Sequence, residues 1–248
     1  MSSTWGGPVH AGVPDDGAVP KYYLAKIEIS ALVDSLGEAA PVPSERELAA
    51  RFGIARETVR QALRELLVEG RIRRRHGRVT VVAGPKIVQP LSIESYTEGV
   101  RKQGRVPGRT LVTLDREPAD AALATHLDVE PGVPVLHVER ILLSDGEPMG
   151  LESTFLPEDR FPRLRDEFDP GTSLYAYIRS TGVTFHAAQE HIETVLASPR
   201  EAGLLGTNPA LPMLLLNRVS RDVGGRPIER VRSLFRGDRF SLVAQLGG

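Results

Sequence analysis

Hydrophobic residues recur at helical spacing in three consecutive stretches near the start of the chain. The first stretch predicts a helix over 21–36, whose apolar side consists of Leu24, Ile27, Leu32 and Leu36. A second helix begins after Ser44, since Ser44 and Glu47 have the S-x-x-E spacing of a capping box, and it ends at Gly53. A third helix covers 56–69 and has an apolar stripe made of Val59, Ala62, Leu63, Leu66 and Leu67. Together these stretches predict a small helical unit.

A short basic hairpin follows the third helix. The segment 71–83 predicts two strands that meet around His76 and Gly77, because its second half is rich in valine. Helix, helix, turn, helix and basic hairpin is the element order of a winged helix-turn-helix, which reads DNA with one helix in the major groove. The first 19 residues are rich in Gly, Pro, Ser and Asp without periodicity and predict a disordered tail. We therefore expect a tail over 1–19 and a DNA-binding domain over 20–84.

The rest of the chain alternates between strand and helix patterns. A linker is expected over 85–96, marked by Gly84, Pro85 and Pro90, and a second domain over 97–248. Strands are predicted over 109–117, 135–143, 148–156, 184–197, 213–222, 227–235 and 240–246. Helices are predicted over 118–127, 172–181 and 199–205. Hairpins with helices between them are typical of an α+β domain built on an antiparallel sheet.

Composition mainly excludes classes of protein. With 41% apolar and 25% charged residues, the chain has the composition of a soluble globular protein. It contains no cysteine, which excludes disulfides, thiolate metal sites and a cysteine nucleophile. No apolar run approaches the roughly 18 residues needed to span a bilayer, and the start of the chain lacks a signal-peptide pattern. We therefore expect a cytoplasmic protein that does not act in a membrane.

The charge of the chain is distributed unevenly between its two parts. The formal net charge is −1, but 44–84 contains ten arginines and five glutamates, a local charge of +5 that leaves −6 for the remainder. A small basic module joined to a larger acidic one indicates that the first binds a polyanion. All ten cations are arginine, which suits bidentate recognition of phosphate and of guanine edges.

Motifs for enzyme or metal chemistry are missing from the sequence. It has no G-x-S-x-G elbow, P-loop, dinucleotide-binding fingerprint or H-E-x-x-H helix. The nearest metal-like group consists of His186, Glu190, His191 and Glu193. His186 and His191 are an odd number of residues apart on a predicted strand and thus point to opposite faces. We expect no enzyme, cofactor or metal site, and we interpret Glu190 and His191 as residues of a strand surface.

Motifs of a known family occur in both parts of the chain. In the first part they are Pro-Ser-Glu-Arg-Glu-Leu-Ala at 43–49 and Ala-Arg-Glu-Thr-Val-Arg-Gln-Ala-Leu at 55–63. In the second part they include Asp-Gly-Glu-Pro-Met at 145–149, Thr-Ser-Leu-Tyr at 172–175 and Arg-Gly-Asp-Arg at 236–239. On these residues the chain resembles the GntR family of bacterial transcription regulators, in its HutC-like subfamily, and is most similar to the amino-sugar regulators NagR and DasR.

The resemblance implies an architecture and a set of partners. It implies an N-terminal winged helix-turn-helix and a C-terminal UTRA effector domain with a chorismate lyase-like fold. It also implies a homodimer, and two-fold symmetry requires a pseudo-palindromic operator in double-stranded DNA. The resulting hypothesis is a DNA-binding regulator, a repressor, whose operator affinity is modulated by a small effector. The alternatives are a constitutive DNA-binding regulator with a degenerate pocket, and a small-molecule-binding protein or enzyme whose N-terminal module is vestigial.

Contacts with DNA are implied by the resemblance at Arg46, Arg56, Arg60 and Gly77. Arg56 and Arg60 also lie in the first half of the predicted recognition helix, the part that reaches base edges. Two further contacts are expected from the residue types, at Thr58 and Arg78. The wing reads Gly-Arg-Val-Thr at 77–80 where relatives carry Gly-Lys-Gly-Thr, so Val79 replaces a glycine. The alternative is that the arginines merely solvate a helix face.

The effector site implied by the resemblance consists of Thr97, Arg140, Glu152, Ser173, Tyr175 and Glu229. Its cationic and hydroxyl side chains can donate hydrogen bonds to phosphate, and its glutamates can accept them from sugar hydroxyls or an amine. An amino-sugar phosphate is therefore a candidate effector. The alternative for any one of these polar residues is that it only completes a hairpin.

Two residues depart from the amino-sugar pattern of the family. Relatives carry Arg-x-Arg where this chain has Arg140-Ile141-Leu142, so one phosphate-binding guanidinium is missing. Relatives also carry tyrosine at the position of Phe235. One charge-assisted hydrogen bond contributes about 1.5–3 kcal/mol. Three hypotheses remain open: the same ligand bound weakly, a different and less anionic ligand, or no ligand. Of these we favour an altered ligand.

Overall fold

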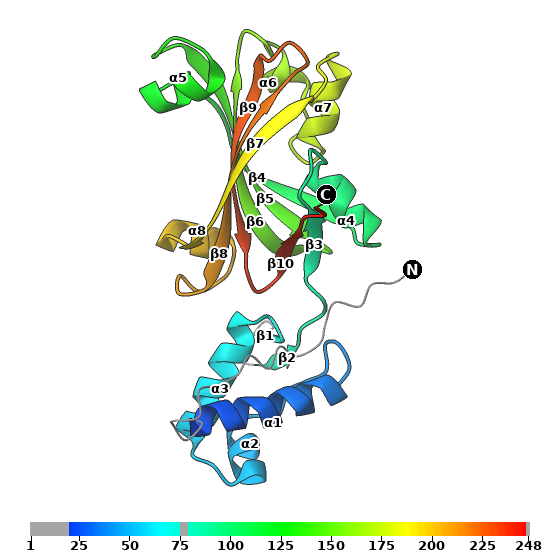
Figure 1. Ribbon diagram of the computed structural model, residues 1–248, viewed down its shortest axis with the longest axis vertical. Helices are drawn as coiled ribbons and strands as arrows, with labels where there is room; N and C mark the ends of the chain where they lie inside the picture. The colour runs from blue at the N-terminus through cyan, green and yellow to red at the C-terminus, as the bar shows by residue number, and fades with distance from the viewer. Residues whose placement is uncertain (1–19, 75–78, 247–248) are drawn as a thin grey trace.

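The computed structural model describes residues 20–74 and 79–246, which form two parts lying one above the other in Figure 1. The smaller part consists of α1 (Lys21–Ser35), α2 (Glu45–Phe52), α3 (Arg56–Val68), β1 (Ile72–Arg74) and β2 (Thr80–Val82). This order confirms the predicted winged helix-turn-helix. The tail predicted over 1–19 and the wing residues His76, Gly77 and Arg78 lie outside the described residues.

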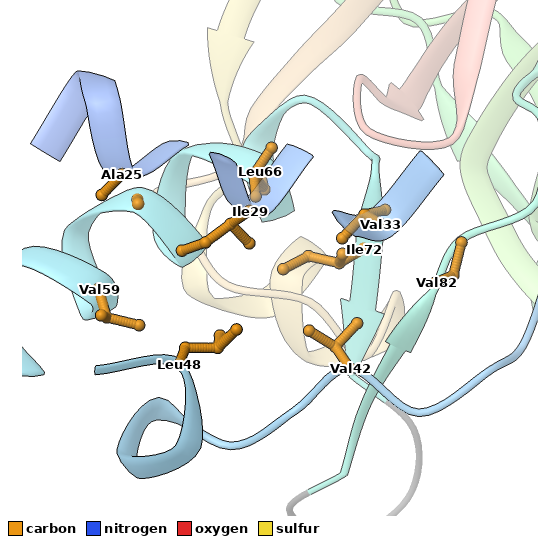
Figure 2. Close-up of a cluster of buried hydrophobic side chains, with 10 residues drawn as sticks. Ala25, Ile29, Val33, Val42, Leu48, Val59, Leu66, Ile72 and Val82 are labelled. Carbon is orange, nitrogen blue, oxygen red and sulfur yellow. The ribbon is translucent and has the colours of Figure 1, made fainter. Parts of the chain in front are cut away.

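One apolar core holds the smaller part together (Figure 2). Its members come from all three helices and from the hairpin, and they include Ile29, Leu48, Val59, Leu66 and Ile72. Full burial of one such side chain contributes about 1.5–3 kcal/mol. The predicted stripe of α3 is confirmed, since Val59, Ala62 and Leu66 are buried and Leu63 and Leu67 pack against them.

The predicted apolar side of α1 is wrong. Leu24 and Ile27 are 52% and 44% exposed, whereas the residues buried against the core are Ala25, Ile29 and Val33. The other two predicted residues are partly buried at the edge of the core: Leu32 and Leu36. The prediction followed the larger side chains, but α1 packs on α3 through smaller and β-branched ones.

The two helices that follow α1 begin differently. The backbone amide of Ser44 donates to Glu47 Oε2 at 2.8 Å, and the amide of Glu47 donates to Ser44 Oγ at 3.3 Å, which confirms the capping box of α2. α2 ends at Gly53, which has a left-handed φ of 63°. α3 follows Ala55, which provides no side-chain cap. The start of α3 therefore lacks a stabilising contact that α2 has.

The larger part is built on a six-stranded antiparallel sheet, which confirms the predicted α+β class. Its strands in spatial order are β4 (Pro107–Pro118), β5 (Pro134–Ser144), β6 (Glu147–Pro157), β9 (Pro227–Arg236), β8 (Pro212–Arg221) and β7 (Ala187–Leu196). The two predicted hairpins, β5–β6 and β8–β9, lie at the centre of the sheet and pair with each other through β6 and β9.

Five short helices accompany this sheet, and they are α4 (Tyr96–Lys102), α5 (Ala121–Leu127), α6 (Leu164–Glu167), α7 (Leu174–Ser180) and α8 (Pro199–Leu204). α4 and α6 are absent from the sequence predictions. α5 begins later than predicted, because Pro118 ends β4 and Asp120 caps the helix. None of the helices within 20–74 and 79–246 is both long and apolar enough to cross a membrane.

The segment predicted as a linker contains a strand. β3 (Ile87–Pro90) pairs in parallel with β10 (Phe240–Val243), near the end of the chain. Two side chains next to this pair strengthen it: Arg239 Nη1 donates to the carbonyl of Gly84 at 3.0 Å, and Lys86 Nζ donates to that of Gly237 at 2.7 Å. The connection between the two parts is therefore anchored to the larger one.

Candidate DNA-binding surface and effector pocket

The residues predicted to contact DNA lie on α2 and α3. Arg46 is exposed in the first turn of α2, and Arg56 is exposed at the first position of α3. Arg60 lies one turn further along α3, beside the partly buried Thr58. Both helices therefore contribute arginines that are at least partly exposed. The predicted contacts Gly77 and Arg78 lie outside the described residues.

Two of these arginines, Arg56 and Arg60, form ion pairs with carboxylates. The sequence prediction missed these pairs. Glu45 Oε2 lies 3.8 Å from Arg56 Nη2 and 3.3 Å from Arg60 Nη2, and Glu57 Oε2 lies 2.7 Å from Arg60 Nη1. The hydrogen bonds that Arg60 donates to Glu45, together with the charges of Glu45 and Glu57, raise the pKa of Arg60. Because water screens such exposed pairs, they contribute little to stability, and phosphate can replace the carboxylates.

One face of the six-stranded sheet carries the main pocket of the larger part. It encloses about 700 Å³ of empty space, including its open mouth. All six strands of the sheet supply side chains to it, and the N-terminal ends of α4 and α7 and the strands β3 and β10 complete its wall. Its charged lining residues are Glu94, Arg109, Arg140, Glu152, Glu190 and Arg218.

All six residues predicted for the effector site gather at this pocket. Four of them line it: Arg140, Glu152, Ser173 and Tyr175. The other two stand behind lining residues. Thr97 Oγ1 accepts a hydrogen bond from Arg109 Nη2 at 2.7 Å, and Glu229 Oε1 accepts one from the Tyr175 hydroxyl at 2.6 Å.

Arg140 is held firmly, since it is 1% exposed. Its Nη2 donates to Glu152 Oε1 at 2.6 Å and its Nη1 donates to the carbonyl of Thr172 at 3.0 Å. Within the described part of the chain, its buried Nε has no hydrogen-bond partner. A buried donor without a partner is costly.

Glu229 is fully buried beneath the pocket. The hydroxyls of Tyr175 and Ser220 donate to its Oε1 at 2.6 and 2.9 Å. Burial raises the pKa of Glu229 to about 7, and burial also raises the pKa of Tyr175. Near neutral pH, Glu229 therefore exists in both the charged and the protonated form.

The sequence prediction missed four charged residues of the pocket: Glu94, Arg109, Glu190 and Arg218. Arg218 Nε and Nη2 each donate to the Glu190 carboxylate at 3.0 Å, and Arg218 Nη1 donates to the Tyr175 hydroxyl at 3.3 Å. Glu190 is thus a pocket residue, which corrects its interpretation as strand surface. Arg109 lies at the start of β4. No local sequence signal groups Arg109, Glu190 and Arg218, because they lie on three different strands.

The metal-like group of the sequence is not assembled. His186 and His191 are exposed, and no cluster of three or more potential metal ligands occurs among residues 20–74 and 79–246. The two departures from the amino-sugar pattern, by contrast, are both buried in one apolar cluster, and Phe235 also lines the pocket. Leu142 is 0% exposed, and Phe235 stacks on Phe240 with ring centres 3.9 Å apart.

Comparisons with known proteins agree with this two-part architecture. Residues 28–82 match the family described as bacterial regulatory proteins, gntR family, and residues 102–241 match the UTRA domain. The chain is 50% identical over 231 residues to the HTH-type transcriptional repressor PhnF of Mycolicibacterium smegmatis, covering 92% of this chain and 94% of that protein. A crystal structure of PhnF from Mycobacterium smegmatis has a TM-score of 0.67 and covers 90% of this chain and 99% of its own.

More distant relatives include repressors with different printed names. The chain is 32% identical over 229 residues to the HTH-type transcriptional repressor NagR of Bacillus subtilis, covering 91% of this chain and 94% of that one. It is 30% identical over 232 residues to the histidine utilization repressor of Pseudomonas putida, covering 92% of each. These relatives are named as repressors and not as enzymes.

Proposed function

The chain belongs to the gntR family of bacterial regulatory proteins and carries a UTRA domain, and on this premise we propose that it is a transcriptional repressor controlled by a small anionic effector. The observation that carries the proposal is that one chain contains two separate arginine sites. One is the exposed face of α2 and α3, and the other is the buried pocket of the sheet. The chain passes from one site to the other through β3.

The DNA site consists of Arg46, Arg56, Thr58 and Arg60, with Gly77 and Arg78 in the wing. Arg56 and Arg60 enter the major groove and Arg46 contacts a phosphate or an outer base. Glu45 and Glu57 hold the guanidinium of Arg60 until DNA replaces them. We expect a homodimer on a pseudo-palindromic operator, because two recognition helices are needed for two half-sites.

The effector site consists of Thr97, Arg140, Glu152, Ser173, Tyr175 and Glu229, and an amino-sugar phosphate is the candidate effector. The free Nε of Arg140 suits an oxyanion. Glu229 and Tyr175 form a hydrogen-bonded group that suits hydroxyls or an amine. The relative named NagR supports an amino sugar only by analogy, since Leu142 and Phe235 depart from that pattern.

Coupling between the sites runs through β3. Gln89 and Pro90 of β3 line the pocket, and the same segment leads back to β2 of the smaller part. A second contact joins the parts directly: Glu147 of β6 lies 4.0 Å from Arg73 of β1 and 3.5 Å from Arg239. An effector that repositions β3 therefore changes the placement of the DNA-binding part. This change shifts the population of the protein away from the arrangement that binds DNA.

The test uses a duplex selected from random sequences by the protein itself. Operator affinity is measured by fluorescence anisotropy while N-acetylglucosamine-6-phosphate or glucosamine-6-phosphate is added. We expect at least a fivefold loss of operator affinity with one of them, in line with usual coupling energies of about 1–3 kcal/mol. The unphosphorylated sugars serve as controls.

An unchanged operator affinity with both phosphosugars would reject the amino-sugar effector. Leu142 and Phe235 would then favour the second candidate function, a constitutive DNA-binding regulator. Failure to select any duplex, with a folded protein, would reject the repressor itself.

A further inference from the structure

We propose that Arg109 supplies the second guanidinium of an oxyanion subsite, in place of the arginine that the family carries at the position of Leu142. This inference deepens the proposed function and rests on its effector pocket. The subsite pairs Arg109 of β4 with Arg140 of β5, and the ligand class it selects is a phosphate-type oxyanion.

The register of the sheet places the two positions side by side. β4 and β5 are antiparallel, and Arg109 is the direct partner of Leu142 across the ladder. Side chains of directly opposite residues leave the same face of the sheet with their Cβ atoms about 4.5–5.5 Å apart. A guanidinium moved from 142 to 109 thus stays over the same pocket, displaced by one strand, while Leu142 fills the core beneath.

Residues of α4 fix the orientation of Arg109. Its Nη2 donates to Thr97 Oγ1 at 2.7 Å, and its guanidinium lies 5.8 Å from the ring centre of Tyr96. Its Nε is buried and has no hydrogen-bond partner in 20–74 and 79–246. The Nε of Arg140 is in the same state. Two arginines of one pocket therefore each retain an unused donor.

Charge compensation distinguishes Arg109 from the other pocket arginines. Arg140 is paired with Glu152, and Arg218 is paired with Glu190. No carboxylate of the described residues lies within 4.0 Å of the Arg109 guanidinium. Burial lowers the pKa of Arg109. The charge of Glu152, which is already paired with Arg140, opposes this shift, and the charge of Arg140 adds to it.

The remaining acids around the pocket do not supply that counter-ion. Glu94 is bonded to Lys102 at 2.6 Å, and Glu98 to Arg179 at 3.2 Å. Glu229 receives its hydrogen bonds from hydroxyls. The excess positive charge of the pocket thus lies at Arg109, next to Arg140, and an oxyanion that accepts from both Nε groups neutralises it.

Inorganic phosphate is the probe for this subsite. Melting temperature and heat of binding are measured with phosphate and with chloride at equal ionic strength, on the full chain. The variants are Arg109→Gln, which keeps a polar side chain but removes the charge, and Arg109→Ala. The matched control is Arg116→Ala, an arginine of the same strand that pairs with Glu158 and does not line the pocket.

We expect saturable stabilisation by phosphate in the wild type and in Arg116→Ala, and at least a tenfold rise of the phosphate Kd in both Arg109 variants. Adding Leu142→Arg to Arg109→Gln restores binding, because it returns the guanidinium to its neighbouring position. No stabilisation of the wild type by phosphate beyond that by chloride overturns the proposal. An unchanged phosphate Kd in a folded Arg109→Gln also overturns it.

The two phosphosugars separate this inference from the proposed function. If phosphate binds through Arg109 while neither phosphosugar changes operator affinity, the subsite stands and the amino-sugar effector fails. If a phosphosugar lowers operator affinity equally in the wild type and in Arg109→Gln, the effector stands and the assignment of Arg109 fails.

Discussion

The two arginine sites of this protein differ in how far their charged side chains are exposed to water. On α2 and α3, the side chains of Arg56 and Arg60 are 63% and 40% exposed, and those of their partners Glu45 and Glu57 are 32% and 68% exposed. In the pocket, the side chain of Arg140 is 2% exposed and bonded to Glu152. The first arrangement exchanges partners easily, which suits the repeating phosphates of DNA. The second is preorganised, which suits one ligand of fixed shape.

The two sites should also respond differently when an arginine is removed. An exposed arginine leaves behind groups that water can solvate, so its loss affects binding more than folding. A buried arginine leaves a carboxylate without its counter-ion, so its loss affects folding first. Binding and stability therefore respond differently to matched substitutions at the two sites.

The largest expected effect is on stability, in the pocket. Arg140→Ala leaves Glu152 without its partner and is expected to lower the free energy of unfolding by about 3–5 kcal/mol. Urea denaturation measures the change, with Arg116→Ala as the exposed control on the neighbouring strand. Equal effects of the two substitutions would remove the contrast between a buried and an exposed site.

The next effect is a pH dependence that only the buried site has. Because the pKa of Glu229 is raised to about 7 in the folded state, the folded protein binds this proton more tightly than the unfolded chain does. The contribution of Glu229 to the free energy of unfolding is therefore fully present below pH 4.5. This contribution is lost as pH rises from about 4.5 to 7. At 1.36 kcal/mol per pKa unit, the loss is about 3 kcal/mol.

Urea denaturation between pH 5 and 8 measures this loss, and Glu229→Gln provides the comparison. The substitution keeps the size of the side chain and removes its titration. We expect the wild type to lose stability relative to Glu229→Gln across this range. Parallel pH profiles of the two proteins would show that Glu229 does not titrate there.

A smaller effect is expected on DNA affinity, at the exposed site. Arg60→Ala should weaken binding to the selected operator by about 1–3 kcal/mol, the usual contribution of a bidentate base contact, with little change in melting temperature. Fluorescence anisotropy at several salt concentrations gives the affinity. A loss of stability without a loss of operator affinity would mean that Arg60, like Arg140, supports the fold and does not contact DNA.

The smallest effect concerns the start of the recognition helix. Ala55→Ser adds the side-chain cap that α3 lacks and should stabilise the protein by about 1 kcal/mol. Thermal denaturation measures this gain, and Ala55→Gly is the control without a side-chain oxygen. No gain from serine over glycine would mean that packing against α1 alone fixes the first turn of α3.

Local signals in the sequence were enough to predict the elements of the smaller part. The capping box at Ser44 and Glu47 and the period of α3 depend on residues within a few positions of each other. The face of α1 was not predicted, since Leu24 and Ile27 are apolar but α3 packs against Ala25 and its neighbours. The capping box at Ser95 that starts α4 has the same local signal and was overlooked.

The pocket was only partly predictable, because its groups meet through pairing between distant strands. Arg109 adjoins Leu142 by the β4–β5 register, and Glu190 meets Arg218 by the β7–β8 register. β3 pairs with β10 about 150 residues away along the chain, beside the bond from Ser241 to Ile87, which spans 154 residues. No local pattern contains these neighbours. From the sequence alone, the absence of an arginine at 142 indicated that the pocket had lost a positive charge. The pairing of β4 with β5 shows that Arg109 brings a positive charge to the neighbouring position.

Reciprocal coupling between the two sites tests the central claim most directly. The affinity of the protein for N-acetylglucosamine-6-phosphate is measured by calorimetry with and without a saturating amount of the selected operator. If effector weakens DNA binding, DNA must weaken effector binding by the same factor, and we predict at least a fivefold loss. An affinity that is the same with and without operator would contradict the account, because the pocket and the DNA-binding surface would then act independently.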